Sequence, residues 1–139
     1  MLLVGITCVV FSLFFAQPKH TTITINGQHF SVELAQTPNQ LERGLGGRSS
    51  IGSDGMLFVL PRRTIPGFWM KDMQFALDFI WIDDGKIVDI TENVQPPKRG
   101  IFTEQLVIYR PHIPVTYVLV VPARFVDDHQ LKVGESIQF

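Results

Sequence analysis

LDFIWIDDGKIVDI, residues 77–90, is the stretch that decides the fold. Asp84 and Gly85 at its centre favour a two-residue β-hairpin turn, because a type I′ turn needs positive φ at both central positions. In the resulting register, opposite charges and similar side chains face each other: Asp83 and Lys86, Ile82 and Ile87, Trp81 and Val88. The stretch therefore predicts two antiparallel strands joined by a tight turn.

A second hairpin is predicted within residues 21–34, where Asn26 and Gly27 provide the same kind of turn. That turn places Ile25 opposite Gln28 and Ile23 opposite Phe30. One face of the hairpin is then apolar and consists of Ile23, Ile25, Phe30, Val32 and Leu34. The apolar face indicates a hairpin that packs on a core.

A short helix follows, near residues 38–46. Thr37 is its expected cap, Pro38 occupies the first helical position and Gln40 completes a capping box. Glycines at positions 44, 46 and 47 end the helix. Further strands are expected at residues 56–60, 68–82, 115–121 and 136–139. Many short strands with one minor helix predict an all-β, mainly antiparallel fold, a compact β-sandwich or barrel-like domain.

The charge balance limits the partners of the domain. Twelve basic and thirteen acidic residues give a net charge of -1 in a chain of 139 residues. This overall balance provides no strong attraction for nucleic acid or for an anionic lipid surface. We therefore expect no nucleic-acid partner, and membrane contact only through the N-terminus. The domain is expected to be a monomer.

Residues 1–17 are interpreted as a signal peptide or an N-terminal membrane anchor, because positions 1–16 are apolar and lack any charged side chain. The single cysteine, Cys8, lies inside this leader. A processed chain would have no disulfide. Residues 20–139 are expected to form one domain outside the cytoplasm, periplasmic or secreted, and tethered by the leader if that is uncleaved.

Three blocks of the sequence carry a family resemblance: GMLFV at residues 55–59, FWMKDM at 68–73 and LDFIWIDDGKIV at 77–88. Together they resemble the signature of the domain of unknown function 192, and the similarity extends from about Thr24 to Phe139. The resemblance implies a mainly antiparallel β-sandwich that often follows an export signal, with no agreed activity. This chain has Asp72 where the family usually has Asn.

A candidate site follows if residues 68–82 form one strand, because ionisable side chains then alternate with apolar ones. Lys71 would lie between Trp69 and Met73, and Asp78 would lie among apolar neighbours, so each would need a partner or water. The functional interpretation is a cleft in which Lys71 or Arg48 binds a polar or anionic group on Trp69, with Asp78 as orienter or base. The structural alternative is that Lys71 only covers Trp69, and that Asp78 caps a turn or pairs with an Arg. The candidate ligand-binding residues are Arg48, Trp69, Lys71, Asp72 and Asp78.

Other chemistry has little support in the sequence. His20, His29, His112 and His129 are isolated from one another, so no metal centre and no cofactor are expected. No catalytic serine motif is found. The favoured hypothesis is a non-catalytic binding or accessory module for a small polar ligand, a glycan or a protein partner. The alternative is a hydrolase that uses Asp78 and Lys71.

Overall fold

The computed structural model describes residues 17–139. The predicted leader lies outside these residues, apart from Gln17, and no helix in the described part is long and apolar enough to cross a membrane. The strands are β1 (His20–Ile25), β2 (Gln28–Ala35), β3 (Gly55–Thr64), β4 (Leu77–Asp83), β5 (Lys86–Val94), β6 (Val115–Pro122) and β7 (Ile137–Gln138). The helices are α1 (Pro38–Arg43), the 3₁₀ turn η1 (Thr103–Gln105) and α2 (Phe125–Asp128).

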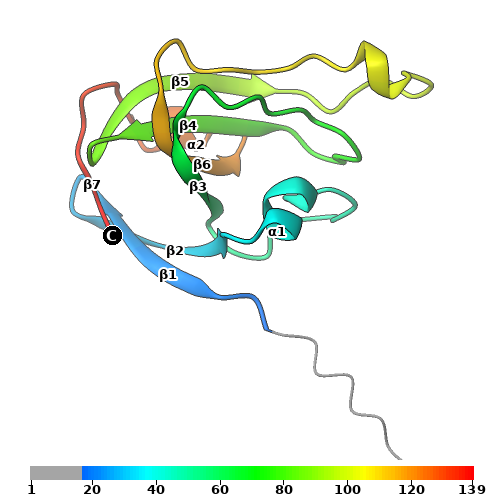
Figure 1. The fold of residues 1–139 in the computed structure, drawn as a ribbon. Coiled ribbons are helices and arrows are strands. Elements are labelled where there is room, and N and C mark those ends of the chain that lie inside the picture. Colours follow the sequence, from blue (N-terminus) through cyan, green and yellow to red (C-terminus); the bar gives the residue numbers. More distant parts are fainter. Residues whose placement is uncertain (1–16) are drawn as a thin grey trace, which may run out of the picture.

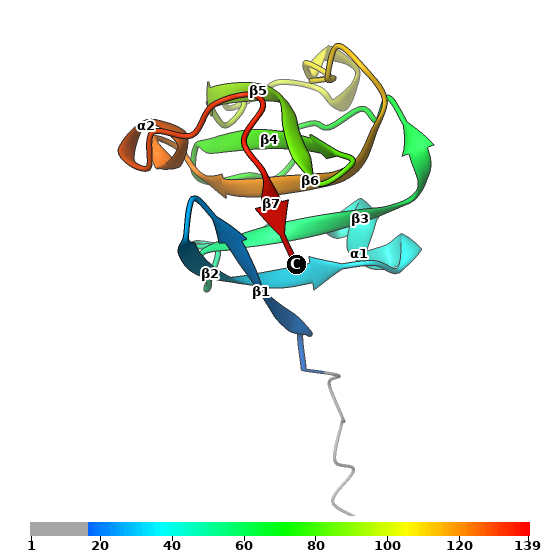
Figure 2. The same cartoon turned by 90° about the vertical axis from the view of Figure 1, so that its left-hand side faces the viewer.

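The strands form one sheet in the order β5-β4-β6-β3-β2-β1-β7. β2 and β3 pair in parallel, and the other neighbouring pairs are antiparallel. The sheet curls until β7 approaches the hairpin of β4 and β5 (Figures 1 and 2). There Lys86 bridges to Ser136, and the N–H of Ile87 donates to the Glu135 carbonyl at 2.9 Å. The result is a half-barrel, which confirms the predicted all-β, barrel-like class.

Both predicted hairpins are present. Ile23 pairs with Phe30 and Ile25 with Gln28 across the Asn26-Gly27 turn, where both residues have positive φ. In the second hairpin Asp83 pairs with Lys86 and Ile82 with Ile87, as predicted. The predicted pairing of Trp81 with Val88 is wrong, because the register shifts there and Trp81 pairs with Asp89. A β-bulge adds one residue to β5 at this point.

Helix α1 begins as predicted, with Thr37 accepting from the Gln40 N–H and the Gln40 side chain closing the capping box. Strand β3 is longer than predicted and runs through Pro61, where its register to β6 shifts. A proline is tolerated at such an irregularity because no ladder hydrogen bond is lost.

The predicted single strand over residues 68–82 is wrong. Regular pairing begins only at Leu77, and residues 65–76 form a loop in which Phe68 makes an isolated bridge to Tyr109. A turn closed by the Met73 N–H and the Met70 carbonyl, with Asp72 at φ 59°, interrupts the extended chain. Lys71 therefore lies in an exposed turn and not on a paired strand between Trp69 and Met73.

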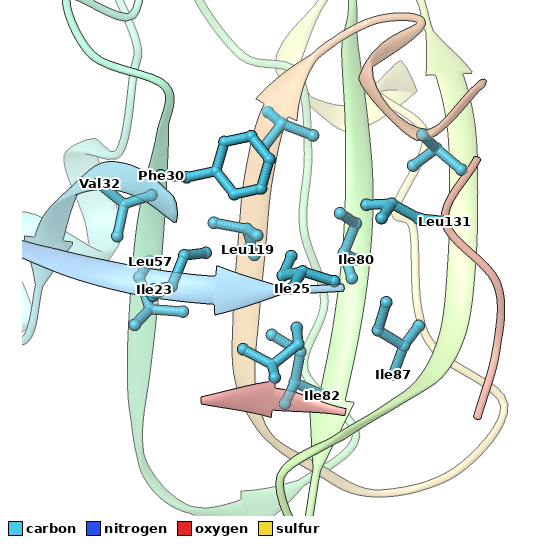
Figure 3. Packing of buried hydrophobic residues seen from close by; sticks show 13 residues of the cluster. Ile23, Ile25, Phe30, Val32, Leu57, Ile80, Ile82, Ile87, Leu119 and Leu131 are labelled. Carbon is cyan, nitrogen blue, oxygen red and sulfur yellow. The ribbon is translucent and has the colours of Figure 1, made fainter. Parts of the chain in front are cut away.

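The sheet is buried on both faces. The first cluster fills the inside of the curl and includes Ile23, Ile25, Phe30, Leu57, Ile80, Ile82 and Leu119 (Figure 3). The second cluster lies on the outer face and includes Met56, Phe58, Met70, Phe79, Trp81, Val118 and Val120. Alternation along β4 sends Ile80 and Ile82 inward and Phe79 and Trp81 outward. The outer face depends on α1 and the connecting loops for its cover.

Candidate functional site

A cleft of about 990 Å³ opens where the cover of the outer face is incomplete. Its floor is apolar and comes from three neighbouring strands: Phe58 and Leu60 on β3, Leu77 and Phe79 on β4, and Val120 on β6. One wall is formed by residues 41–47, which end α1 and continue into the glycine turn. The other wall is formed by residues 66–74. In Figure 1 both walls lie at the same end of the half-barrel.

The first wall approaches the floor closely at Gly44, which has no side chain. Gly44 has φ 48° and ψ -127°, a conformation that favours glycine. A β-carbon built on Gly44 would lie 3.1 Å from Cζ of Phe58, so the backbone rests almost directly on the aromatic ring. A larger residue at position 44 would strain the backbone and crowd the floor.

The second wall carries Trp69 and Lys71 at the mouth of the cleft. The Lys71 ammonium lies 5.4 Å from the centroid of the Trp69 ring, within the range of a cation–π contact. Trp69 is 41% exposed, which is unusual for such a large apolar side chain. Lys71 forms no ion pair with any residue of the range 17–139. A cation is thus held beside an apolar floor and remains available to an anion.

Asp72 also lines this wall. Its backbone is left-handed, which Asn adopts most readily among non-glycine residues and Asp also tolerates. The carbonyl of Asp72 accepts a hydrogen bond of 2.9 Å from the Gly47 N–H. The structure therefore places Trp69, Lys71 and Asp72 in the same wall of the cleft.

Asp78 lies away from these three residues, inside the domain, and is fully buried. Its Oδ1 accepts from the Asn93 N–H at 2.7 Å, and its Oδ2 accepts from the Val126 N–H at 3.0 Å. These bonds hold the end of β5 and the start of α2 against β4. Both carboxylate oxygens accept backbone hydrogen bonds, which is the geometry expected if Asp78 caps a turn and has no part in binding a ligand.

Arg48 is likewise engaged in a structural pair. Its guanidinium donates to Glu33 through two nitrogens, at 2.7 and 2.9 Å, and Nη1 also lies 3.4 Å from the Ile51 carbonyl. The hydrogen bonds from Arg48 hold the pKa of Glu33 below its usual range, and the same bonds raise the pKa of Arg48. Arg48 therefore anchors the loop after α1 to β2 and does not meet Trp69 or Lys71 at the cleft.

Sequence reasoning did not find Glu42 and Arg43, which line the cleft beside the glycine turn. The feature of the sequence that could have indicated them is the adjacent group of glycines at positions 44, 46 and 47, because glycine allows the backbone to approach another group closely. Within residues 17–139, no three His, Cys, Asp or Glu side chains group closely enough to hold a metal ion. The cleft chemistry consists of an apolar floor, two cations and two carboxylates.

A model of the family DUF192, described as an uncharacterized ACR, matches residues 21–139. A solved structure from Sinorhizobium meliloti 1021, described as a candidate transcription regulator, is 30% identical with a TM-score of 0.72; the match covers 84% of this chain and 89% of that one. A protein of unknown function from Novosphingobium aromaticivorans DSM 12444 is 23% identical with a TM-score of 0.77, covering 90% and 89% of the two chains, respectively. No protein with a curated function matches in sequence.

Proposed function

The chain belongs to the DUF192 family, and from that premise we propose that its domain is a non-catalytic binding module that works outside the cytoplasm. The proposed ligand is a small organic molecule with an apolar body and one anionic or strongly polar head group. The observation that carries the proposal is the Lys71 ammonium held over Trp69 at the mouth of an apolar cleft.

The size and lining of the cleft suit a small molecule. A volume of about 990 Å³ falls at the upper end of the range for small-molecule sites, which are mostly apolar with a few polar groups. Leu60 on the floor and Phe68 and Met73 on the second wall are only half-buried, so they offer apolar surface to the apolar body. Burial of apolar surface on that floor supplies binding energy of about 25 cal/mol per Å².

The mouth of the cleft favours a single anionic group. Lys71 and Arg43 are cations without an ion-pair partner among the described residues, so either can pair with a carboxylate or a sulfonate. Glu42 and Asp72 line the same cleft and would repel a ligand with several negative charges. The two carboxylates can instead accept hydrogen bonds from hydroxyl or amide groups of the ligand.

A glycan has less support as the ligand. Stacking of a sugar needs an open aromatic face, whereas Trp81 is fully buried and the Trp69 ring carries the Lys71 ammonium. Hydrolysis by Asp78 and Lys71 also has little support, because both oxygens of Asp78 accept backbone hydrogen bonds away from the cleft. These observations favour binding of an amphipathic anion.

The location outside the cytoplasm rests on the sequence. An apolar stretch precedes the domain, and the only cysteine lies within that stretch, so the domain itself has no thiol to oxidise. The placement is tested by fusing a periplasmic reporter to the C-terminus of the full chain. Reporter activity in the periplasm supports the placement, and activity in the cytoplasm alone contradicts it.

The binding proposal is tested by a thermal-shift screen of the domain against small organic anions and their neutral analogues. A ligand that binds the folded state raises the Tm, by an amount that grows with its concentration over Kd. We expect anions with an apolar body to raise the Tm of the wild type and of Lys132→Ala, and to have a much smaller effect on Lys71→Ala. Lys132 is an exposed lysine outside the cleft. Equal shifts for both variants would contradict the proposal.

A further inference from the structure

Four exposed apolar side chains belong to the long connection between β5 and β6. Ile101 is 42% exposed, Phe102 72%, Val107 60% and Ile108 44%, and we call these four residues the apolar loop surface. The connection projects at the end of the half-barrel that also carries the cleft (Figure 1). Because Phe68 bridges to Tyr109 in antiparallel fashion, Ile108 is a neighbour of Trp69 at the cleft mouth. Several large apolar side chains exposed within one short segment are typical of an interaction site.

Basic residues flank the apolar loop surface. Lys98 and Arg99 precede it and Arg110 follows it, and all three are exposed and form no ion pair within residues 17–139. Glu104 is the one acidic residue between positions 98 and 110. The connection is therefore locally cationic, although the net charge of the whole chain is -1.

We propose that the apolar loop surface docks on an anionic lipid membrane, with Phe102 and Val107 entering the boundary of the acyl chains and Lys98, Arg99 and Arg110 binding lipid phosphates. Apolar side chains next to long cationic ones are the combination that binds the interface of a membrane. This inference is independent of the ligand proposed for the cleft.

Other occupants fit the surface less well. A second copy related by a two-fold axis would bring two surfaces that both carry Lys98, Arg99 and Arg110 against each other, and like charges oppose that contact. Exposed aliphatic side chains such as Val107 and Ile108 offer nothing to the phosphates of a nucleic acid. A lipid surface matches both the charge and the apolar character.

Vesicle co-sedimentation tests the proposal. Residues 17–139 are used, because they contain all seven strands and both clusters and because the apolar leader would bind lipid by itself. Folding is checked first by circular dichroism and a thermal melt. The vesicles are neutral phosphatidylcholine, or phosphatidylcholine with one third phosphatidylglycerol.

We expect binding to the anionic vesicles, weakened by salt, and little binding to the neutral ones. Phe102→Ser should weaken binding about tenfold. Replacing Lys98 and Arg99 together by Ser should weaken it about 25-fold, or about fivefold for each basic residue. Val133→Ser is the matched control, since Val133 is 59% exposed outside this connection and should leave binding unchanged.

Three outcomes would overturn the proposal. Equal binding to neutral and anionic vesicles would show that the basic residues do not contribute to binding. A loss of vesicle binding in Val133→Ser equal to that in Phe102→Ser would show that the apolar loop surface is not the binding surface. Absence of vesicle binding together with a dimer that Phe102→Ser dissociates would show that the surface binds protein.

Discussion

The backbone N–H of Gly47 donates a 2.9 Å hydrogen bond to the carbonyl oxygen of Asp72. This bond joins the two walls of the cleft, since Gly47 ends the glycine turn and Asp72 belongs to the wall that carries Trp69 and Lys71. Gly46 contributes to the same contact, because a β-carbon built on it would lie 3.5 Å from the Lys71 carbonyl. Backbone contacts therefore fix the two walls relative to each other at the mouth of the cleft.

Gly44→Ala should destabilise the domain by about 1–3 kcal/mol, because alanine strains the backbone at φ 48° and its β-carbon meets Phe58. Gly47→Ala is the matched control. Gly47 also has positive φ, but a β-carbon there would have no atom within 4 Å, so we expect a loss of about 1 kcal/mol. Urea unfolding measures both, and equal losses would show that the contact with Phe58 is unimportant.

Asp78→Asn should lower the free energy of unfolding by about 2 kcal/mol. Each oxygen of Asp78 accepts one backbone N–H, from Asn93 or from Val126, and the NH₂ group of asparagine can replace neither oxygen as an acceptor. Asp72→Asn is the control and should change stability by less than about 0.5 kcal/mol, since Asn suits a left-handed residue. Denaturant melts give both values. A stable Asp78→Asn protein would contradict the structural role of Asp78.

The pair of Glu33 and Arg48 should make stability depend on pH. Arg48 lowers the pKa of Glu33 in the folded state, so the stabilisation is fully present above the unfolded pKa of about 4.3 and is lost as the pH falls through the folded pKa. Glu33→Gln should cost about 1–2 kcal/mol at pH 7, a range reduced because Arg48 is partly exposed.

Unfolding of the wild type and of Glu33→Gln is compared between pH 7 and pH 3. The difference in stability between the two proteins should shrink as the pH falls below about 4. Glu42→Gln is a control, because Glu42 forms no ion pair within the described residues and should show no such convergence. A constant difference between wild type and Glu33→Gln would show that the carboxylate charge is not the cause.

Local signals in the sequence were sufficient for the hairpins and for the start of α1. The turns at Asn26-Gly27 and Asp84-Gly85 fix their own registers, and Thr37, Pro38 and Gln40 act within one turn of the chain. The bulge opposite Trp81 could not be predicted in this way. It depends on twist and packing in the whole sheet, and Trp81 fits the local pattern equally well opposite Val88 or Asp89.

The candidate site was predicted in part. Trp69, Lys71 and Asp72 are neighbours in the chain and meet at the cleft, whereas Arg48 and Asp78 have partners that are distant in sequence. Asp78 binds the N–H of Val126, 48 residues away, through a helix that the sequence pattern did not reveal. Long-range partners decide whether a charged side chain is free, and a single sequence does not specify them.

The central claim, that the cleft binds an amphipathic anion through Lys71, is tested most directly by following backbone amide signals of the domain during titration with octanoate and, separately, octanol. We expect octanoate to shift the amide signals of residues 44–47 and 67–74. Lys71→Ala should weaken octanoate binding about fivefold, as loss of one exposed charge pair would, and leave octanol binding unchanged. Lys132→Ala should bind both like the wild type. Shifts confined to residues outside the cleft, or equal binding of octanoate to the wild type and Lys71→Ala, would contradict the claim.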